Sequence, residues 1–218
     1  QDCLGVVGRG THNAIACYPG TQLDSNYSMN VVDICPVGAM TSKDFRFKMR
    51  VWFLKSTPTI DVNCGTGTNI NIWTREQQVY RITPRQNDAV NSCWMPDDHR
   101  LNYKFINAAT RITTPLVKTD AGADQRPSTW DATFNMVVEQ LHRMAPSETA
   151  MICSARMTNE ELYMVRALAR QLGVTKIDIV PRKGENDGLL VSDDRNPNTN
   201  GAKMILGKTG AGLANIRR

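Results

Sequence analysis

Apolar and polar residues alternate along residues 59–84 with the period of two that is typical of β-strands. Three alternating segments, TIDVN, TNINIW and QVYRITP, are separated by breaks at 65–67 and 75–77. Successive side chains of a strand point to opposite faces, so this pattern predicts a small antiparallel meander. Two shorter apolar runs, at 4–7 and 14–17, flank a glycine-containing turn and predict a pair of strands.

The last third of the chain has a helical period that alternates with short apolar runs. Ser128 or Thr129 can cap one helix, and Thr158 with Glu161 three residues later forms a capping box for another, which Gly173 ends. Helices are therefore expected at 130–144 and 159–172, and strands at 150–153 and 176–180. Alternating helices and strands favour a layered, mostly parallel sheet.

Other segments carry weaker signals. Residues 21–34 are expected to be mostly loop, and Ser42 can cap a helical turn that runs to Phe47. Residues 50–54 predict a strand or an extended linker, and Thr57-Pro58 marks a boundary. Asp97-Asp98 can start a helix that continues to Phe105.

Composition and charge exclude some classes of protein. The 218 residues carry a formal net charge of +5, and 41% of them are hydrophobic. Lys and Arg are spread along the chain apart from a denser stretch at 43–50, so a solvated face or a docking surface for an acidic partner is favoured over nucleic-acid binding. No signal peptide is visible, and no apolar run is long enough to span a membrane.

Six cysteines stand without a CxxC pair, at positions 3, 17, 35, 64, 93 and 153. Without an export signal, a disulfide framework is not expected, and most of these thiols are expected to be reduced and buried. Cys35 differs from the others because Pro36 follows it in VVDICPVGAM. Proline fixes φ and offers no backbone N–H, so it turns the chain away after a metal-ligating cysteine, although a Cys-Pro pair alone is weak evidence.

The wider stretch around Cys35 is more specific. NVVDICPVGAMTSKDFRFKMRVWFL and VYRITPRQNDAVNSCWMPDDHRLNYKFIN strongly resemble the large iron–sulfur subunit of NADH:quinone oxidoreductase, respiratory complex I. The resemblance includes LGVVGRGTHNAIACYPG, STWDATFNMVVEQL and DDRNPNTNGAKMILG, so it covers nearly the whole chain. Related subunits occur in NAD-linked hydrogenases.

The resemblance implies a metal ligand and a cofactor. Cys35 corresponds to the fourth ligand of a [4Fe–4S] cluster, and its three partner cysteines are expected in a CxxCxxC loop before Gln1. The chain begins with Gln1 and looks like part of a longer polypeptide. The family implies other redox subunits as partners, and a peripheral position on the cytoplasmic side of the inner membrane, or the matrix side in mitochondria.

The remaining cysteines are not expected to be ligands. Some bacterial family members hold a further cluster in the meander, and the positions of its four ligands here are Asp61, Cys64, Thr68 and Pro96. One thiolate cannot hold a cubane cluster, so Cys64 is interpreted as structural. Cys3, Cys17 and Cys93 lie where the family places no ligand.

The resemblance also implies a fold class. We expect an α+β chain with the C-terminal part of a [4Fe–4S] domain at 1–56, a β meander plus helix at 57–112, and a truncated α/β part at 113–218. The last region resembles molybdopterin oxidoreductases. As in complex I, it is expected to hold no molybdopterin.

Two further patterns suggest chemistry that the sequence does not support. Residues 202–209 fit the loose phosphate-loop pattern [A/G]xxxxGK[S/T], but Lys, Met, Ile and Leu occupy the inner positions, which argues against nucleotide binding. His12, His99 and His142 are isolated in sequence and are expected to be surface or helix residues. The chain is therefore expected to have no catalytic site of its own.

Three functions remain open from the sequence. The first is an electron-transfer subunit of complex I, the second the diaphorase part of an NAD-linked hydrogenase, and the third a cofactor-free scaffold that docks partner subunits. The segment from 43 to 54 alternates cations with apolar residues. We expect its apolar side chains to pack between domains, and Lys43, Arg46 and Lys48 to face solvent or an acidic partner subunit.

Overall fold

The chain folds into two units that interleave in sequence. The computed structural model describes residues 3–118, 122, 124–207, 213 and 216. Unit 1 comprises Gln1–Asp61 and Gly67–Asn107, and unit 2 comprises Val62–Thr66 and Ala108–Arg218. The five residues Val62–Thr66, which separate the two parts of unit 1, thus belong to unit 2, whose other residues all follow Asn107 in sequence. The domain bounds expected from the sequence remain predictions.

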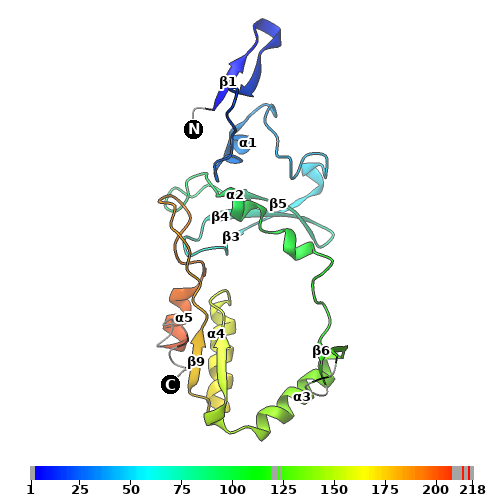
Figure 1. Ribbon diagram of the computed structural model, residues 1–218, viewed down its shortest axis with the longest axis vertical. Coiled ribbons are helices and arrows are strands. Elements are labelled where there is room, and N and C mark those ends of the chain that lie inside the picture. The colour runs from blue at the N-terminus through cyan, green and yellow to red at the C-terminus, as the bar shows by residue number, and fades with distance from the viewer. Residues whose placement is uncertain (1–2, 119–121, 123, 208–212, 214–215, 217–218) are drawn as a thin grey trace. The chain divides into compact units, whose positions relative to one another are not determined.

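The N-terminal part of unit 1 is a hairpin followed by loop and short helices (Figure 1). Strands β1 (Leu4–Val7) and β2 (Ala14–Cys17) pair antiparallel, as predicted, around a 3₁₀ turn at Gly10–His12. Helix α1 (Asn30–Ile34) lies in a stretch predicted as loop. A 3₁₀ turn at Val51–Phe53 replaces the strand or linker predicted there.

The predicted meander is confirmed as an antiparallel sheet in the order β3-β4-β5. Its strands are β3 (Lys55–Ile60), β4 (Asn69–Arg75) and β5 (Gln78–Pro84). Strand β4 pairs with both neighbours, and its register with β5 shifts between Trp73 and Thr74. The helix expected to run from Asp97 to Phe105 is divided into α2 (Asp97–Leu101) and a 3₁₀ turn at Lys104–Asn107.

The apolar core of unit 1 is small. Its fully or nearly buried members are Ile70, Ile82, Met95 and Tyr103, with Ile72 and Val79 packed against them. The two isoleucines come from β4 and β5, and the other two residues flank α2. This core therefore joins the meander to α2.

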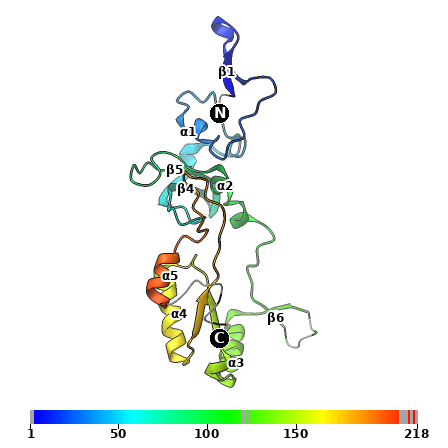
Figure 2. The same ribbon diagram turned by 60° about the vertical axis from the view of Figure 1, so that its left-hand side comes forward.

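The long part of unit 2 contains most of the regular helices (Figure 2). Short strands β6 (Leu116–Val117) and β7 (Arg126–Pro127) pair antiparallel. Then follow α3 (Trp130–Arg143), a 3₁₀ turn at Pro146–Glu148, β8 (Ala150–Cys153), α4 (Asn159–Gln171), β9 (Lys176–Ile179) and α5 (Thr199–Leu206).

The capping signals of unit 2 act as predicted. The Thr129 hydroxyl caps α3 by accepting from the backbone N–H of Ala132, and Thr158 and Glu161 form a complete capping box at α4. Gly173 follows α4 with φ of +68°, a left-handed conformation that glycine adopts without steric cost. The core of the unit lies between β8, β9, α4 and α5, and its buried members are Cys153, Ala155, Leu162, Ile179 and Ala202.

The layered sheet expected in unit 2 is confirmed only in part. Strands β8 and β9 are parallel, but in the described ranges they form a sheet of two strands, so the layering of molybdopterin oxidoreductases is not confirmed. Helix α3 leaves the apolar side chains of Phe134, Val137 and Val138 exposed. The α+β class holds at the coarser level of mixed helices and small sheets.

Candidate metal-ligand site

Cys35 lies at the C-terminal end of α1, where the chain leaves the helix. Its backbone N–H still donates to the carbonyl of Val31 at 3.1 Å, while its own ψ of 110° is extended. Pro36 cannot continue the helix, and Gly38 turns the chain with φ of +69°. Helix α1 therefore fixes the position of the Cys35 backbone, and the Pro-Val-Gly-Ala segment folds back beside the Cys35 side chain.

The turn after Cys35 presents backbone N–H groups to its sulfur. The N–H of Met40 lies 3.5 Å from the Cys35 Sγ. Hydrogen bonds from Met40 and Val37, with smaller contributions from Ala39 and Gly38, hold the pKa of the thiol below its ordinary value against the opposing effect of burial. Donors that converge on a sulfur stabilise the thiolate, which is the form that binds a metal.

Asn30 anchors α1 to the segment that precedes α2. Its side-chain amide donates to the carbonyl of Met95 at 2.8 Å, and its Oδ1 accepts from the N–H of Met95 at 3.0 Å and from Arg100 at 3.1 Å. The Asn30 side chain is buried and cannot bond to water, so these hydrogen bonds satisfy its polar groups. The first residue of α1 is thus locked in place four residues before the end of the helix.

Two carboxylates complete the connection between α1 and α2. Asp97 accepts from the Ser28 hydroxyl at 2.7 Å and from the N–H of Met29 at 2.9 Å, next to the positive end of α1. Asp33 forms an ion pair with Arg100 at 2.7 Å. Both ends of the helix that carries Cys35 are therefore held by charged residues of α2.

The chain after Cys35 is attached to the meander. Asp44 accepts from the Tyr103 hydroxyl at 2.6 Å and pairs with Lys104 and Lys48. Partial burial opposes ionisation of Asp44, but the bonds from Tyr103 and Lys104 and the positive charge of Lys48 outweigh it and lower the pKa of the carboxyl. The Cζ atom of Arg81, in β5, lies 4.6 Å from the Phe45 ring centroid. The loop after Cys35 is therefore held at two neighbouring residues, Asp44 and Phe45.

The other cysteines show no ligand geometry. All six are free thiols, and Cys3, Cys64 and Cys153 are buried. The Cys64 Sγ lies 3.7 Å from the carbonyl of Leu190, a weak bond inside unit 2. Cys17 and Cys93 are exposed. Among the described residues no group of three His, Cys, Asp or Glu side chains could hold a metal ion.

His99 lies in α2, as a helix residue was expected to, but its side chain is buried and has a polar partner. Its Nδ1 lies 2.6 Å from Oδ2 of Asp61, and both side chains are buried inside unit 1. The backbone N–H of Asp61 also donates to the carbonyl of Thr68 at 2.7 Å. A polar pair thus occupies a place where the resemblance to the family would put a thiolate. Its members lie 38 positions apart in the chain, so no local pattern signalled it.

The remaining sequence predictions for the site have mixed outcomes. Residues 202–206 of the phosphate-loop pattern are helical in α5, whereas Lys208 and Thr209 lie outside the described residues. Lys43, Arg46 and Lys48 are all exposed, as expected, and Lys48 also pairs with Asp44 of the same unit. Within the described parts of the chain, no helix is long and apolar enough to cross a membrane.

Two family descriptions match the chain. Residues 1–41 match "NADH-quinone oxidoreductase subunit 3, ferredoxin-like domain", and residues 54–104 match "NADH-ubiquinone oxidoreductase NDSU1/NuoG-like, 4Fe-4S domain". The first range contains Cys35, and the second contains the meander and α2.

Curated relatives with similar descriptions align with most of the chain. The mitochondrial NADH dehydrogenase (ubiquinone) iron-sulfur protein 1 of Solanum tuberosum is 36% identical over 80% of this chain, and the 75 kDa subunit of Reclinomonas americana NADH-ubiquinone oxidoreductase is 35% identical over 80%. The mitochondrial 78 kDa subunit of Neurospora crassa NADH-ubiquinone oxidoreductase is 38% identical over 78%. The chain spans 23–25% of the length of these relatives.

Proposed function

We propose that this chain, which belongs to the family of large iron–sulfur subunits of NADH:quinone oxidoreductase, supplies Cys35 as one thiolate ligand of a [4Fe–4S] cluster. The observation that carries the proposal is the set of backbone N–H groups that faces the Cys35 sulfur in the CPVGA turn. The match of residues 1–41 to a ferredoxin-like domain of the family supports the same position.

The residues of the turn fit this role. A thiolate ligand must stay deprotonated, and N–H donors to a cluster sulfur tune the reduction potential. When bound, the cluster supplies one-electron transfer. The chain itself holds the sulfur at the end of α1, directs backbone donors toward it, and prevents it from moving by fixing α1 through Asn30, Asp97 and Asp33. Three further thiolates have to come from residues other than those described.

The whole protein then takes part in electron transfer from NADH toward quinone. The names of the relatives place them in NADH-ubiquinone oxidoreductases, which supports this role and implies other redox subunits as partners. We place the protein at the periphery of the membrane, on the cytoplasmic side or, in mitochondria, on the matrix side. Unit 2 acts in this proposal as a scaffold without molybdopterin.

A Cys35→Ala variant of the assembled protein tests the ligand. The expected result is the loss of one reduced-state [4Fe–4S] signal in the EPR spectrum, together with a fall of about four iron atoms per protein. The sulfur is needed because three thiolates leave one iron of the cubane without its protein ligand.

Two other cysteines serve as controls for that experiment. Cys93→Ala removes an exposed thiol and Cys64→Ala removes a buried one, and neither change should alter the iron content or the spectrum. An unchanged spectrum in the Cys35 variant would contradict the proposal and leave the scaffold function. A lost signal in the Cys64 variant would show that the meander holds a cluster.

A further inference from the structure

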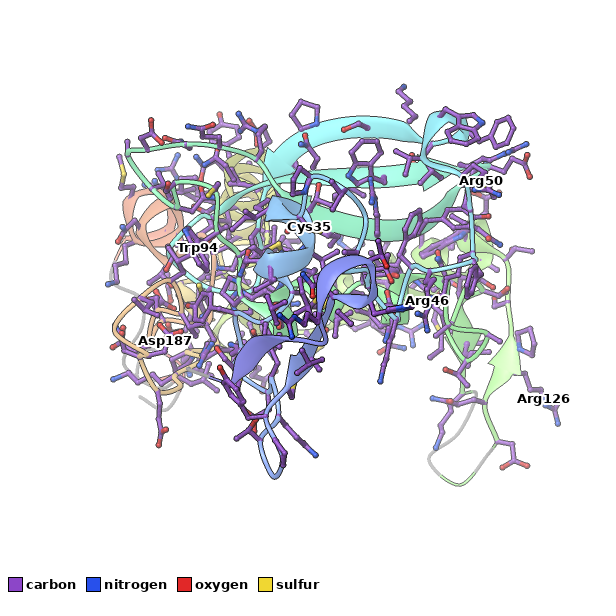
Figure 3. The ribbon with its side chains drawn as sticks, turned by 90° about the horizontal axis from the view of Figure 1, so that it is seen from above. Cys35, Arg46, Arg50, Trp94, Arg126 and Asp187 are labelled. Atoms are coloured by element: carbon purple, nitrogen blue, oxygen red, sulfur yellow. The ribbon has the colours of Figure 1, made fainter. Side chains whose placement is uncertain are left out.

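One surface of unit 1 carries exposed aromatic rings beside arginines. It is formed by the 3₁₀ turn at Val51–Phe53, the loop before it and the end of β4. Its members, which we call the arginine–aromatic face, are Arg46, Phe47, Arg50, Trp52, Phe53 and Arg75. Figure 3 shows Arg46 and Arg50 on the same side of Cys35 in that view.

The rings of this face are more exposed than a folded monomer requires. Phe47 is 96% exposed, Trp52 73% and Phe53 55%. The sequence analysis singled out this segment for its alternation of cations and apolar residues, and the structure of unit 1 leaves its rings exposed. Large exposed apolar side chains that are grouped together are typical of interaction sites.

The backbone holds Phe47 in an unfavourable conformation. Its φ is +65°, in the left-handed region that a bulky side chain rarely adopts. The bonds from Arg46 N to Ser42 O at 2.8 Å and from Lys48 N to Phe45 O at 3.1 Å enclose this residue. The loop conformation therefore directs the Phe47 ring into solvent, where an apolar ring has no favourable contacts.

Each ring has an arginine guanidinium over it at cation–π distance. The Cζ atom of Arg46 lies 5.2 Å from the Phe47 ring centroid, that of Arg50 lies 5.7 Å from the Trp52 ring, and that of Arg75 lies 5.2 Å from the Phe53 ring. A guanidinium stacked by its face leaves its N–H edge open to a carboxylate. The face thus presents apolar surface and anion-binding edges together.

Two of these arginines have no acidic partner among the described residues. Glu76 pairs with Arg75 at 3.1 Å, and Asp44 pairs with Lys48 and Lys104. Neither acid reaches Arg46 or Arg50, and Lys43 and Lys55 add further exposed positive charge nearby. A hollow lined by Phe47, Met49, Phe53 and Arg75 offers room for an inserted side chain.

We propose that the arginine–aromatic face docks an acidic segment of another subunit, in which carboxylates alternate with apolar side chains. The carboxylates receive bidentate hydrogen bonds from Arg46 and Arg50, and the apolar side chains cover Phe47, Trp52 and Phe53. The unmatched positive charge of the face selects an acidic partner over a second copy of this chain, which carries a net charge of +5. The proposal does not depend on the cluster ligand.

A peptide-binding experiment tests the chemistry of the partner. The probe is a fluorescent twelve-residue peptide of Glu-Leu-Glu repeats, and the comparison peptides replace Glu by Lys or Leu by Ser. Fluorescence anisotropy should show binding of the Glu-Leu-Glu peptide at least about tenfold tighter than either comparison, weakening as the salt concentration rises. Equal binding of all three peptides, or no binding of the first, would overturn the proposal.

Variants of the chain connect that binding to the face. Arg46→Glu with Arg50→Glu, and separately Phe47→Ser with Trp52→Ser, should each weaken binding at least about tenfold. Lys118→Glu with Arg126→Glu makes the same charge change at exposed positions of unit 2 and should leave binding unchanged. Circular dichroism checks that every variant is folded, and Arg46→Lys with Arg50→Lys keeps the charge while removing the planar edges, so it should give an intermediate affinity.

Cross-linking in the assembled complex tests which molecule covers the face. With Phe47→p-benzoylphenylalanine, light should link this position to a segment of another subunit that contains Glu or Asp beside apolar residues. The same change at Met204, an exposed residue of α5, is the control and should not give that link. A link to a second copy of the chain, or tighter binding of an RNA oligomer than of the acidic peptide, would overturn the proposal.

Discussion

The two units are stabilised in different ways. Unit 2 has an apolar core between regular helices and strands, with Leu162 and Ile179 at its centre. Unit 1 has a smaller core and adds buried polar connections, among them Asn30 with Met95 and Asp61 with His99. Apolar packing gives stability without direction, whereas hydrogen bonds fix both position and orientation. The unit that carries the proposed ligand thus has the more directional set of contacts.

Leu162→Ala should have the largest effect on stability, and it should be confined to unit 2. The side chain is fully buried among Cys153, Ala155 and Ile179, so the change removes apolar contact and leaves a cavity. We expect a loss of about 2–5 kcal/mol in the free energy of unfolding, measured by urea denaturation. Leu189→Ala, at an exposed position of the same unit, is the control and should cost much less. A similar loss in both variants would mean that unit 2 has no specific core.

Asn30→Ala should have a smaller effect on stability but a clear one near Cys35. The change leaves the buried N–H and carbonyl groups of Met95 without partners, which costs about 1–3 kcal/mol. Hydrogen exchange should become faster in α1, and alkylation of Cys35 should change in rate relative to Cys17. Asn200→Ala is an exposed control. If exchange in α1 stayed at the level of the unchanged protein, the polar connection would not position the helix.

Tyr103→Phe should give the smallest effect, and the effect should depend on pH. The lowered pKa of Asp44 means that its bonds stabilise the fold above the ordinary pKa of 3.8 and lose this contribution as the pH falls through the lower folded-state value. Removing the hydroxyl, which also donates to the carbonyl of Tyr80, should cost about 1 kcal/mol at neutral pH and less in acid. Urea denaturation at pH 7 and pH 3 measures both values. An equal cost at the two pH values would contradict the assigned role of Asp44.

The accuracy of sequence-based prediction depends on how far apart in the chain the interacting residues lie. The meander, the capped helices α3 and α4 and the turn at Gly173 were predicted because each depends on residues within a few positions of one another. Helix α1 was missed because it is five residues long and has no side-chain cap of its own. Its N-terminus is bonded instead by Asp97, 68 residues away, and no local pattern shows such a partner.

At the candidate site, the sequence predicted the residue but not its surroundings. Cys35 was selected from the Cys-Pro pair and the family resemblance, and its place at the end of a helix with backbone donors around the sulfur became visible only in the structure. The buried pair of Asp61 and His99 was missed because His99 looked isolated in the sequence. The exposure of Phe47, Trp52 and Phe53 on unit 1 became visible only in the structure, because an alternation of apolar and charged residues does not reveal which side chains the fold covers.

The interleaved chain order has a consequence for synthesis on the ribosome. Val62–Thr66 belongs to unit 2, and the contact of Cys64 with Leu190 joins residues 126 positions apart. At ordinary elongation rates, Leu190 follows Cys64 after about 6–25 s. During this interval the nascent chain carries a thiol that is only 1% exposed in the finished fold, so Cys64 is open to oxidants before the protein is complete and protected from them afterwards.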